Sequence, residues 1–350
     1  MRHFNSLNII YICTSDKGPS GGAKTIYNHS DLINKINIEN LTSEILHIKK
    51  KKISKWNSSI KKIFKFSESR YYGWNTKDIT ISKGFKSKWF KSDIKSRDEF
   101  NFSKEKDFVI FPEIFAHFAK KLCIQNGISY AIFVQNGYSL NSTGDKKTLK
   151  DVYKNAKFIL SYSKDITKCI NLAFKNCNKK ILKINISINP DKFNSKIKKK
   201  NIITYMPRKL STHSDNLVFF IKGFLPKNWK LKPLHNLNEK QIFYNLSKSK
   251  IFLSFSNMEG LGIPPIEAAI AGNKVIGYHG RGGLEYWRKP IFTEIQHGNI
   301  SKFIDEILFC IKKKNLTNNL KKYKKKIIKQ FSAEIEKKHI INMIKKIRSN

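Results

Sequence analysis

Acidic residues and arginine are both scarce in this sequence. Its 350 residues include 26 Asp and Glu against 68 Lys and Arg, a formal charge of +42, and arginine fills only seven positions. Such a positive charge suits nucleic acid or an anionic membrane surface. Nucleic-acid readers depend on arginine for bidentate base contacts, so its scarcity argues against a specific nucleic acid. Because asparagine and isoleucine are abundant too, we attribute the charge mainly to the codon bias of an AT-rich genome, with membrane attraction as a second effect.

Cysteine and long apolar runs are also in short supply. The five cysteines are scattered and form no Cys-x-x-Cys pair, which argues against a disulfide framework or zinc site and favours a reducing cytosol. No apolar run approaches the ~18 residues of a membrane span. The N-terminal apolar segment is too short, and Asp16 comes too early, for a signal peptide. From the cysteines and the lack of a membrane span or signal peptide we expect a cytoplasmic protein. No internal repeat of fixed period is visible.

The most informative stretch runs from 251 to 287. An apolar strand at 251–255 leads into a polar glycine loop, and a helix at 265–271 follows with proline at its favoured first position. A second strand, at 274–278, leads into the glycine cluster 280–283. This order predicts parallel strands whose loops gather at their carboxyl ends. Glycine loops beside a helix N-terminus suit a phosphate or diphosphate.

Two carboxylates frame the first of these loops. Glu259 lies in the loop, and Glu267 is expected in the first helical turn, so that both face one cleft. Carboxylates beside an anion site are better suited to the hydroxyls of a ribose or sugar than to the phosphate itself. The alternative is an ordinary strand–helix turn whose glutamate complements the helix dipole, and the spacing alone leaves both open.

These residues carry a family resemblance. Glu259, Gly260, Gly262 and Glu267, with the Pro-Pro-Ile-Glu-Ala run and the strand Ala-Gly-Asn-Lys-Val-Ile-Gly, resemble the donor-site signature of family-four GT-B glycosyltransferases. The resemblance covers about 200–287 well, and the N-terminal half only through a glycine loop and its strand order. It implies an α/β fold of two Rossmann-like domains that face each other across a cleft, with a C-terminal helix crossing back to the first. It also implies retaining transfer from a nucleotide sugar.

The resemblance assigns roles to the same residues. Glu267 is expected at the nucleotide ribose and Glu259 at the transferred sugar. The diphosphate and donor loops are then formed by Gly260, Leu261, Gly262, Gly282 and Gly283. The family's next motif, Gly-Gly-x-x-Glu, is one residue shorter here, which puts a role for Glu285 in doubt.

Two cations follow a predicted strand at 201–206. Arg208 and Lys209 stand near the place where the family has an Arg and a Lys that stabilise the leaving diphosphate, although the family's Lys usually lies several residues further on. The guanidinium fork of Arg208 suits phosphate. A plain surface basic pair is the alternative, and it weighs more for Lys209 than for the scarce arginine.

The N-terminal half offers candidate acceptor residues. Gly21 and Gly22 stand between a strand at 7–13 and a helix at 25–36, and they resemble the family's N-domain glycine loop. Tight turns need glycine in any case. Strands at 107–111, 129–134 and 158–161 each end in polar residues, where parallel sheets hold ligands. From these strand ends come the acceptor-side candidates Glu113, His117, Gln135 and Asn136. For His117 a structural role is the alternative.

Residues 49–106 mix lysine and serine with scattered aromatics. Within them Tyr71, Tyr72, Gly73 and Trp74 are a candidate acceptor-facing patch by position alone. The favoured alternative is that these aromatics belong to the core. Two further alternatives are contact with single-stranded nucleic acid and contact with lipid headgroups.

We expect the chain to divide into an acceptor-side domain at 1–190, a donor domain at 191–325 and a C-terminal helix at 326–350 that can pack on the first domain. The segment 181–193 resembles the family's interdomain crossing, and the lysine run 196–200 reads as a linker. Helical patterns occupy 301–313 and 316–347. The second is basic, and it either packs on the first domain or lies on a membrane surface.

The sequence is therefore interpreted as a retaining glycosyltransferase that moves a sugar from a nucleotide sugar to a glycan or lipid-linked acceptor. The expected setting is bacterial surface polysaccharide or lipopolysaccharide assembly, in the cytoplasm or on the inner face of its membrane. We expect no cofactor and no divalent metal, because no Asp-x-Asp occurs to bridge a diphosphate through an ion. The alternatives are a GT-B nucleotide-sugar epimerase, a phosphorylase, for which the chain is short, and a non-enzymatic nucleic-acid-binding protein.

Overall fold

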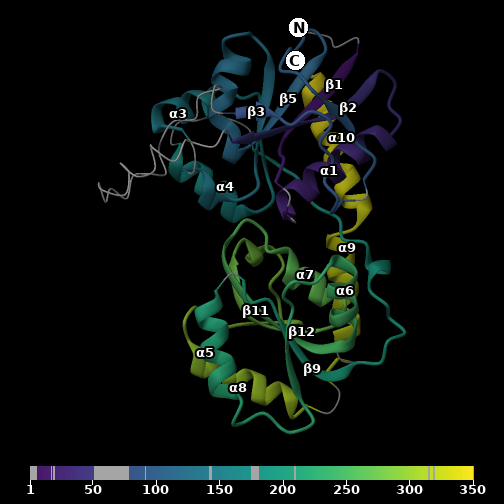
Figure 1. The fold of residues 1–350 in the computed structure, drawn as a ribbon, viewed down its shortest axis with the longest axis vertical. Coiled ribbons are helices and arrows are strands. Elements are labelled where there is room, and N and C mark those ends of the chain that lie inside the picture. Colours follow the sequence, from purple (N-terminus) through teal and green to yellow (C-terminus); the bar gives the residue numbers. More distant parts are fainter. Residues whose placement is uncertain are drawn as a thin grey trace. The chain divides into compact units, whose positions relative to one another are not determined.

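A computed structural model describes residues 6–16, 18, 20–50, 79–90, 92–141, 144–174, 181–208, 210–313, 316–317 and 320–349. The chain forms two compact units (Figure 1). Unit 1 contains Met1–Tyr162, Ile166–Ile184 and Lys337–Asn350, and unit 2 contains Ser163–Asp165 and Asn185–Glu336. The proposed patch at Tyr71–Trp74 lies outside the described residues, as does Lys209.

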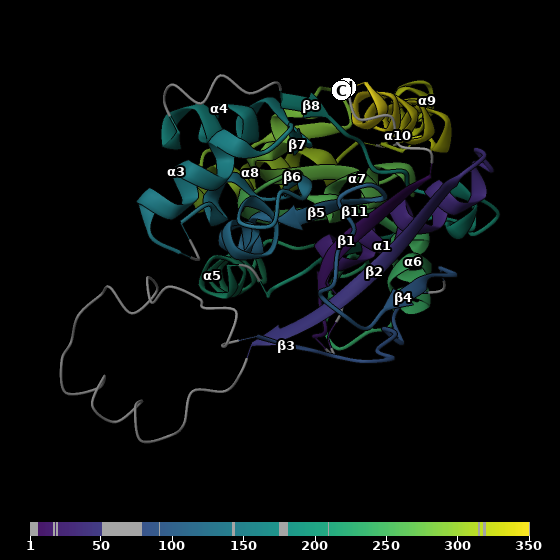
Figure 2. The ribbon, with the colours of Figure 1, turned by 90° about the horizontal axis from the view of Figure 1, so that it is seen from above.

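Unit 1 is built on a sheet in the order β3-β2-β1-β5-β6-β7-β8, with β4 also paired to β2. The strands are β1 (Leu7–Thr14), β2 (Leu41–Lys50), β3 (Ile79–Ile81), β4 (Lys95–Arg97), β5 (Asp107–Pro112), β6 (Ser129–Val134), β7 (Ile159–Ser161) and β8 (Ile181–Lys183). β3 pairs antiparallel with β2, at the far end of that long strand (Figure 2), whereas β1, β5, β6 and β7 pair in parallel. All of β5 is buried, as expected for a parallel strand covered on both faces.

The helices of unit 1 follow its strands. They are α1 (Gly21–Lys35), α3 (Lys146–Asn155) and α4 (Lys164–Ala173), with the short turns η2 (Glu113–Phe118), η3 (Lys120–Ile124) and η4 (Gly137–Ser139). The predicted loop at Gly21 and Gly22 is wrong, because both glycines lie in the first turn of α1. The Ser20 hydroxyl accepts a hydrogen bond from the Ala23 N–H at 3.4 Å and so starts the helix earlier than the apolar pattern suggested.

The end of the chain also belongs to unit 1. A single helix at 316–347 was predicted, but the structure has two, α9 (Lys321–Gln330) and α10 (Ala333–Arg348). Phe331 leaves the helical conformation with its side chain buried, and the Ser332 hydroxyl accepts from the Ile335 N–H to begin α10. Within unit 1, the Lys157 ammonium donates to the Ile347 carbonyl at 2.8 Å, and Ile340, Met343, Ile344 and Ile347 are buried.

Unit 2 has a five-stranded sheet in the order β10-β9-β11-β12-β13, and its pairings are parallel. The strands are β9 (Lys200–Tyr205), β10 (Lys230–Pro233), β11 (Ser249–Glu259), β12 (Lys274–Arg281) and β13 (Phe292–Glu294). The helices are α5 (Ser211–Ile221), α6 (Glu239–Lys248), α7 (Ile263–Ile270), α8 (Ile300–Ile311) and α9, with the turns η5 (Pro190–Lys192) and η6 (Gly282–Glu285). One apolar core joins α5 and α8 to β9, β11 and β12, through buried residues such as Leu217, Phe303 and Phe255.

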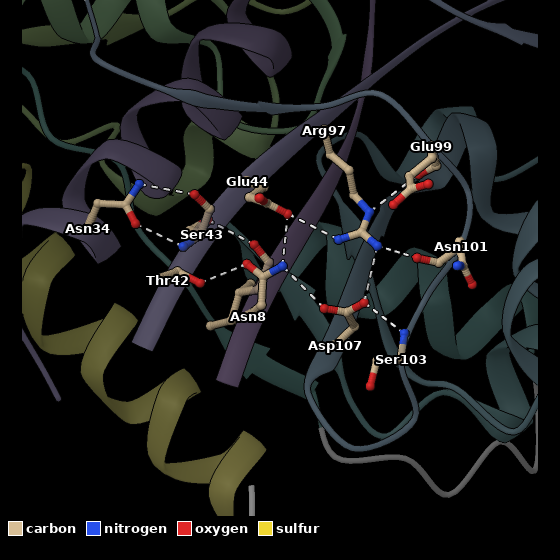
Figure 3. Close-up of polar contacts among 11 residues, drawn as sticks. Asn8, Asn34, Thr42, Ser43, Glu44, Arg97, Glu99, Asn101, Ser103 and Asp107 are labelled. Atoms are coloured by element: carbon tan, nitrogen blue, oxygen red, sulfur yellow. Dashed lines mark hydrogen bonds and ion pairs between the residues drawn. The ribbon is translucent and has the colours of Figure 1, made fainter. Parts of the chain in front are cut away.

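A partly buried polar network joins neighbouring strands of unit 1 (Figure 3). The Arg97 guanidinium lies 3.2 Å from a Glu44 oxygen and 3.4 Å from an Asp107 oxygen, and it also donates to the Asn101 carbonyl. The Asn8 amide donates to both carboxylates, at 2.8 and 3.2 Å. The network thus ties Arg97, at the end of β4, to the amino-terminal parts of β1, β2 and β5.

Candidate functional site

The site is built at the carboxyl ends of β11 and β12 in unit 2. β11 continues to Glu259 and β12 to Arg281, so the predicted strands at 251–255 and 274–278 were too short. The extension is irregular, because the register of the pair shifts between Ser256 and Glu259 before Glu259 meets Arg281. Polar residues that read as loop in the sequence are therefore held in the sheet, and the remaining turns are short.

Glu267 lies deeper in its helix than the sequence suggested. Because Gly262 takes a left-handed conformation at φ 77° and serves as N-cap, α7 begins at Ile263, two residues before the predicted start. Glu267 is therefore not in the first turn, which holds no acidic residue, and the expectation that it lies there was wrong. Its side chain is buried, whereas that of Glu259 is half-buried. Nothing acidic in that turn offsets the positive end of the α7 dipole.

The two glycine-bearing turns lie directly against each other. A Cβ at Gly282 would stand 2.2 Å from the Gly260 carbonyl oxygen and 2.4 Å from that of Glu259. A Cβ at Gly280 would stand 3.0 Å from the Glu259 Cγ. Only glycine allows this approach. The structure thus brings Glu259, Gly260 and Gly282 together, and the two loops gather as the sequence predicted.

Hydrogen bonds from neighbouring residues hold the first turn in place. The Tyr286 hydroxyl donates to the Gly262 carbonyl at 2.6 Å, and the Ser163 hydroxyl donates to the Gly260 carbonyl at 2.9 Å. Burial, with a smaller contribution from the Glu259 charge, raises the pKa of Tyr286 well above its usual value, so this phenol stays a neutral donor. Leu261, between the two glycines, is buried and anchors the turn.

Arg208 follows β9, which pairs with β11. Tyr205, the last residue of β9, lies opposite Leu253, so the exposed Arg208 comes from the carboxyl end of the strand next to β11. Arg208 therefore follows β9 at the same edge of the sheet as the glycine turns.

Sequence reasoning missed several polar residues at this edge. The Ser254 hydroxyl donates to the Tyr278 carbonyl at 2.8 Å and lies 3.1 Å from the Ser256 hydroxyl. The Tyr278 hydroxyl lies 3.1 Å from His213 Nδ1 and accepts from the Gly298 N–H at 3.2 Å. Burial, then the neighbouring His297, lowers the pKa of His213. The available signal was positional, since polar residues at the ends of parallel strands are candidates wherever they occur.

Glu285, whose role the short motif left in doubt, has a definite place. Its carboxylate accepts from the Lys164 N–H at 2.7 Å, and its carbonyl accepts from the Gln330 side chain at 3.3 Å. Beside it, the Arg281 guanidinium lies 3.5 Å from an Asp165 oxygen. Glu285 therefore ties the turn η6 to the segment Ser163–Asp165.

Unit 1 brings three of its four acceptor-side strand-end candidates together. The Glu113 carboxylate accepts from the Gln135 N–H at 2.9 Å and from the Asn136 N–H at 3.1 Å. The Gln135 amide donates to the Gly22 carbonyl at 3.1 Å, and a Cβ at Gly22 would overlap that amide oxygen at 2.1 Å. Burial raises the pKa of Glu113 to about 7, against the opposing effect of these N–H donors.

His117 and the side chain of Asn136 are used differently. The ring centres of His117 and Phe118 are 3.9 Å apart, and a Cβ added at Gly144 would stand 2.8 Å from the His117 Cβ. His117 is therefore packed in the interior. The Asn136 side chain accepts from the Tyr138 N–H at 3.0 Å and caps η4. Both residues thus have structural roles near the Gly22–Gln135–Glu113 group.

Within the described part of the chain, no group of three or more His, Cys, Asp or Glu side chains is placed to hold a metal ion. In the same residues, no helix is long and apolar enough to span a bilayer.

Comparisons with known proteins rest on structure. No protein-family model and no curated protein matches the sequence. A glycosyltransferase from Rickettsia africae matches the fold with a TM-score of 0.62 at 13% identity, over 99% of this chain and 100% of that one. Anabaena HepE in complex with UDP-glucose matches with a TM-score of 0.61 at 10% identity, over 97% and 99%.

A mutant of S. aureus TarM in complex with fondaparinux, alpha-GlcNAc-glycerol and UDP is also similar. It has a TM-score of 0.62 at 12% identity, over 98% of this chain and 100% of that one. Likeness at these identities establishes the fold. The chain thus has the two-sheet α/β architecture of GT-B glycosyltransferases along nearly its whole length, and the expected fold class is confirmed.

Proposed function

We propose that this protein is a metal-independent, retaining glycosyltransferase that uses a nucleotide sugar. The observation that carries the proposal is the contact between the two glycine turns beside Glu259, at the carboxyl edge of a unit 2 sheet in a GT-B fold. The turns, the N-terminus of α7, whose first turn holds no acidic residue, and Arg208 supply positive potential for a diphosphate. HepE is similar to this chain and has been solved with UDP-glucose, which supports the donor class.

The donor is proposed to lie along the edge formed by β9, β11 and β12. Gly260, Leu261 and Gly262 approach its diphosphate together with Gly282 and Gly283. Glu267 binds the nucleotide ribose, and Glu259, on the turn itself, binds hydroxyls of the transferred sugar. Both assignments follow from the resemblance, and the half-buried position of Glu259 beside the turn agrees with its part.

Bond breaking is proposed to depend on charge stabilisation. As the bond between the sugar's anomeric carbon and the diphosphate oxygen breaks, Arg208, Lys209 and the α7 N-terminus stabilise the negative charge on the nucleotide diphosphate. The acceptor hydroxyl forms the new bond from the face that the nucleotide leaves, which retains configuration. Its proton passes to the leaving phosphate oxygen, so no carboxylate nucleophile and no divalent ion are required.

The acceptor is proposed to contact unit 1. Gly22 and Gln135, held by the buried Glu113, form the polar group at its strand ends, and Gly21, His117 and Asn136 complete the candidate set. A glycan or lipid-linked acceptor of bacterial surface polysaccharide or lipopolysaccharide assembly is proposed, on the cytoplasmic side of the membrane. S. aureus TarM, whose structure contains fondaparinux and alpha-GlcNAc-glycerol, is similar over the whole chain.

The test is a thermal-shift and calorimetric screen against UDP, GDP, ADP, CMP and dTDP sugars, with and without EDTA. A ligand that binds only the folded state raises the melting temperature. We expect one nucleotide class to bind, unaffected by EDTA, with binding lost in Arg208→Ala and Glu267→Ala and kept in the matched surface variant Glu306→Ala. Anomeric analysis of the product by NMR then tests retention. Binding of nucleic acid with a steep salt dependence, and of no nucleotide sugar, would overturn the proposal.

A further inference from the structure

Large aromatic side chains are exposed together on the outer side of one helical layer in unit 2. Phe219, Phe220, Phe224 and Phe309 are 74, 51, 67 and 57% exposed. Phe219 and Phe220 lie on α5, Phe224 comes just after its end, and Phe309 lies on α8. Exposed aromatics in such a group usually mark an interaction surface.

The two helices present these residues on a common side. α5 buries Ser214, Leu217 and Ile221, and α8 buries Phe303, Ile307 and Cys310, against the same apolar core. α5 and α8 also pack against each other, and Figure 1 shows them as neighbours. At 100° per residue, Phe219 lies opposite the buried stripe of α5, and Phe309 lies well away from that of α8. Both aromatics therefore face away from the sheet.

Lysines outnumber acidic residues around this aromatic face. Lys222, Lys227, Lys312 and Lys313 are exposed beside it, and the Lys313 ammonium stands 4.2 Å from the centre of the Phe309 ring. No acidic residue occurs from 216 to 238 or from 307 to 333. Asp215 and Asp305 lie one turn before Phe219 and Phe309 on the same helix faces, and Glu306 is paired with Lys302 at 3.3 Å.

We propose that this aromatic–basic face of α5 and α8 docks on an anionic phospholipid bilayer. Phenylalanine rings enter the boundary between headgroups and acyl chains, while lysines on the same face remain at the level of the anionic headgroups. Four exposed rings framed by lysine provide both the apolar area and the charge that stable surface binding requires. The face is distinct from the carboxyl edge that holds the candidate donor site, so docking leaves that edge free.

The test is co-sedimentation of the full chain with phosphatidylcholine vesicles, with and without phosphatidylglycerol. Because the whole chain is basic, matched controls decide the result. Phe219→Ser/Phe309→Ser is expected to lower partition onto anionic vesicles about tenfold or more, and Lys222→Ser/Lys312→Ser about tenfold. Partition onto anionic vesicles is expected to stay within about twofold in three controls. These are Tyr244→Ser and Leu172→Ser, at exposed apolar residues, and the lysine pair Lys232→Ser/Lys240→Ser. Asp305→Asn is expected to strengthen binding.

Three results would overturn the proposal. Equal losses in the patch and control lysine variants would show attraction by net charge alone, and unchanged binding of the phenylalanine variant would show that the rings do not insert. Conversion of a dimer to a monomer by Phe219→Ser/Phe309→Ser, without vesicle binding by the parent chain, would show an interface between copies. Transfer to a soluble acceptor, measured without vesicles, is expected to be unchanged in these variants, so failure of docking and failure of glycosyl transfer are separable.

Discussion

At the scale of single residues, the glycines of the candidate site make the sharpest prediction. A Cβ at Gly282 would meet the Gly260 carbonyl oxygen at 2.2 Å, so Gly282→Ala must push the two turns apart. We expect a loss of about 1–3 kcal/mol in the free energy of unfolding, together with weaker nucleotide-sugar binding.

Urea unfolding and calorimetric titration measure these two effects. Gly223→Ala is the matched control, because an added Cβ there meets nothing within 4 Å. Normal donor affinity in Gly282→Ala would show that the contact between the turns has no part in the site.

The buried carboxyl of Glu113 predicts a pH dependence of stability. Burial raises its folded-state pKa from 4.5 to about 7, so between these values the folded protein holds a proton that the unfolded chain releases. Its contribution to stability is therefore fully present below pH 4.5 and is lost as the pH rises to about 7. Over this range the free energy of unfolding falls by about 3 kcal/mol.

Urea titrations at pH 5 and 7.5 measure this loss. Glu113→Gln keeps an acceptor oxygen and is expected to flatten the profile relative to the parent, whereas Glu306→Gln on α8 keeps the slope. A Glu113→Gln profile with the parent's slope would assign the pH dependence to other groups.

At the scale of elements, helix α6 shows what local sequence can predict. Asn238 caps it in a full capping box: its side chain accepts from the Gln241 N–H at 2.9 Å, and the Gln241 side chain accepts from the Asn238 N–H at 2.9 Å. Asn238→Ala should lower the free energy of unfolding by about 1 kcal/mol. Asn228→Ala, at an exposed loop position, serves as the control. Equal melting temperatures for the two variants would contradict the cap.

Other elements show where sequence reading fails. The predicted bounds of β6 match the structure, because an apolar run bounded by polar residues defines a buried strand. The ends of β11 and β12 were missed because Ser256, Glu259 and Arg281 stay in the sheet through pairing with each other's strand, which local polarity does not reveal. The break between α9 and α10 was missed because Phe331 continues the apolar period while its backbone leaves the helix.

The candidate site likewise has parts that the sequence predicted and parts that it did not. The order of strand, glycine loop, helix, strand and glycine loop predicted that the two loops gather at the carboxyl ends of parallel strands. The close contact of Gly282 with Gly260 came only from the structure. Ser163, which holds the turn, is 97 residues from Gly260, and Tyr286, 24 residues from Gly262, carries no local motif that marks it as a partner of the turn. Their contribution depends on tertiary packing, which one sequence does not encode in a readable pattern.

The network around Arg97 joins elements of unit 1. Its guanidinium is mostly buried between Glu44 and Asp107, so Arg97→Met leaves two carboxylates without their cation. We expect a loss of about 3 kcal/mol in the free energy of unfolding. Lys35→Met, which breaks an exposed pair with Asp31, should cost about 0.5 kcal/mol or less. Similar unfolding midpoints for the two variants would refute a stabilising part for the network.

At the scale of the whole molecule, the charge of +42 predicts a dependence of stability on salt. Self-repulsion among so many lysines destabilises the compact state, and added salt screens it. We expect the melting temperature to rise by several degrees between low salt and about 0.5 M sodium chloride. Differential scanning calorimetry measures the shift, with an uncharged osmolyte series as the control for general solvent effects. A falling melting temperature would show that favourable ion pairs outweigh the repulsion.

The division of unit 1 along the chain has a consequence for biosynthesis. Its last segment, Lys337–Asn350, is joined to the rest of the unit only after Asn185–Glu336 has been translated. Until the ribosome releases that segment, the apolar surface that receives Ile340, Met343, Ile344 and Ile347 is uncovered, although every strand of the sheet has already emerged. Unit 2 ends at Glu336 and is therefore fully translated before that segment emerges. The N-terminal unit is therefore the later of the two to mature, and loss of Lys337–Asn350 would harm the part of the protein made first.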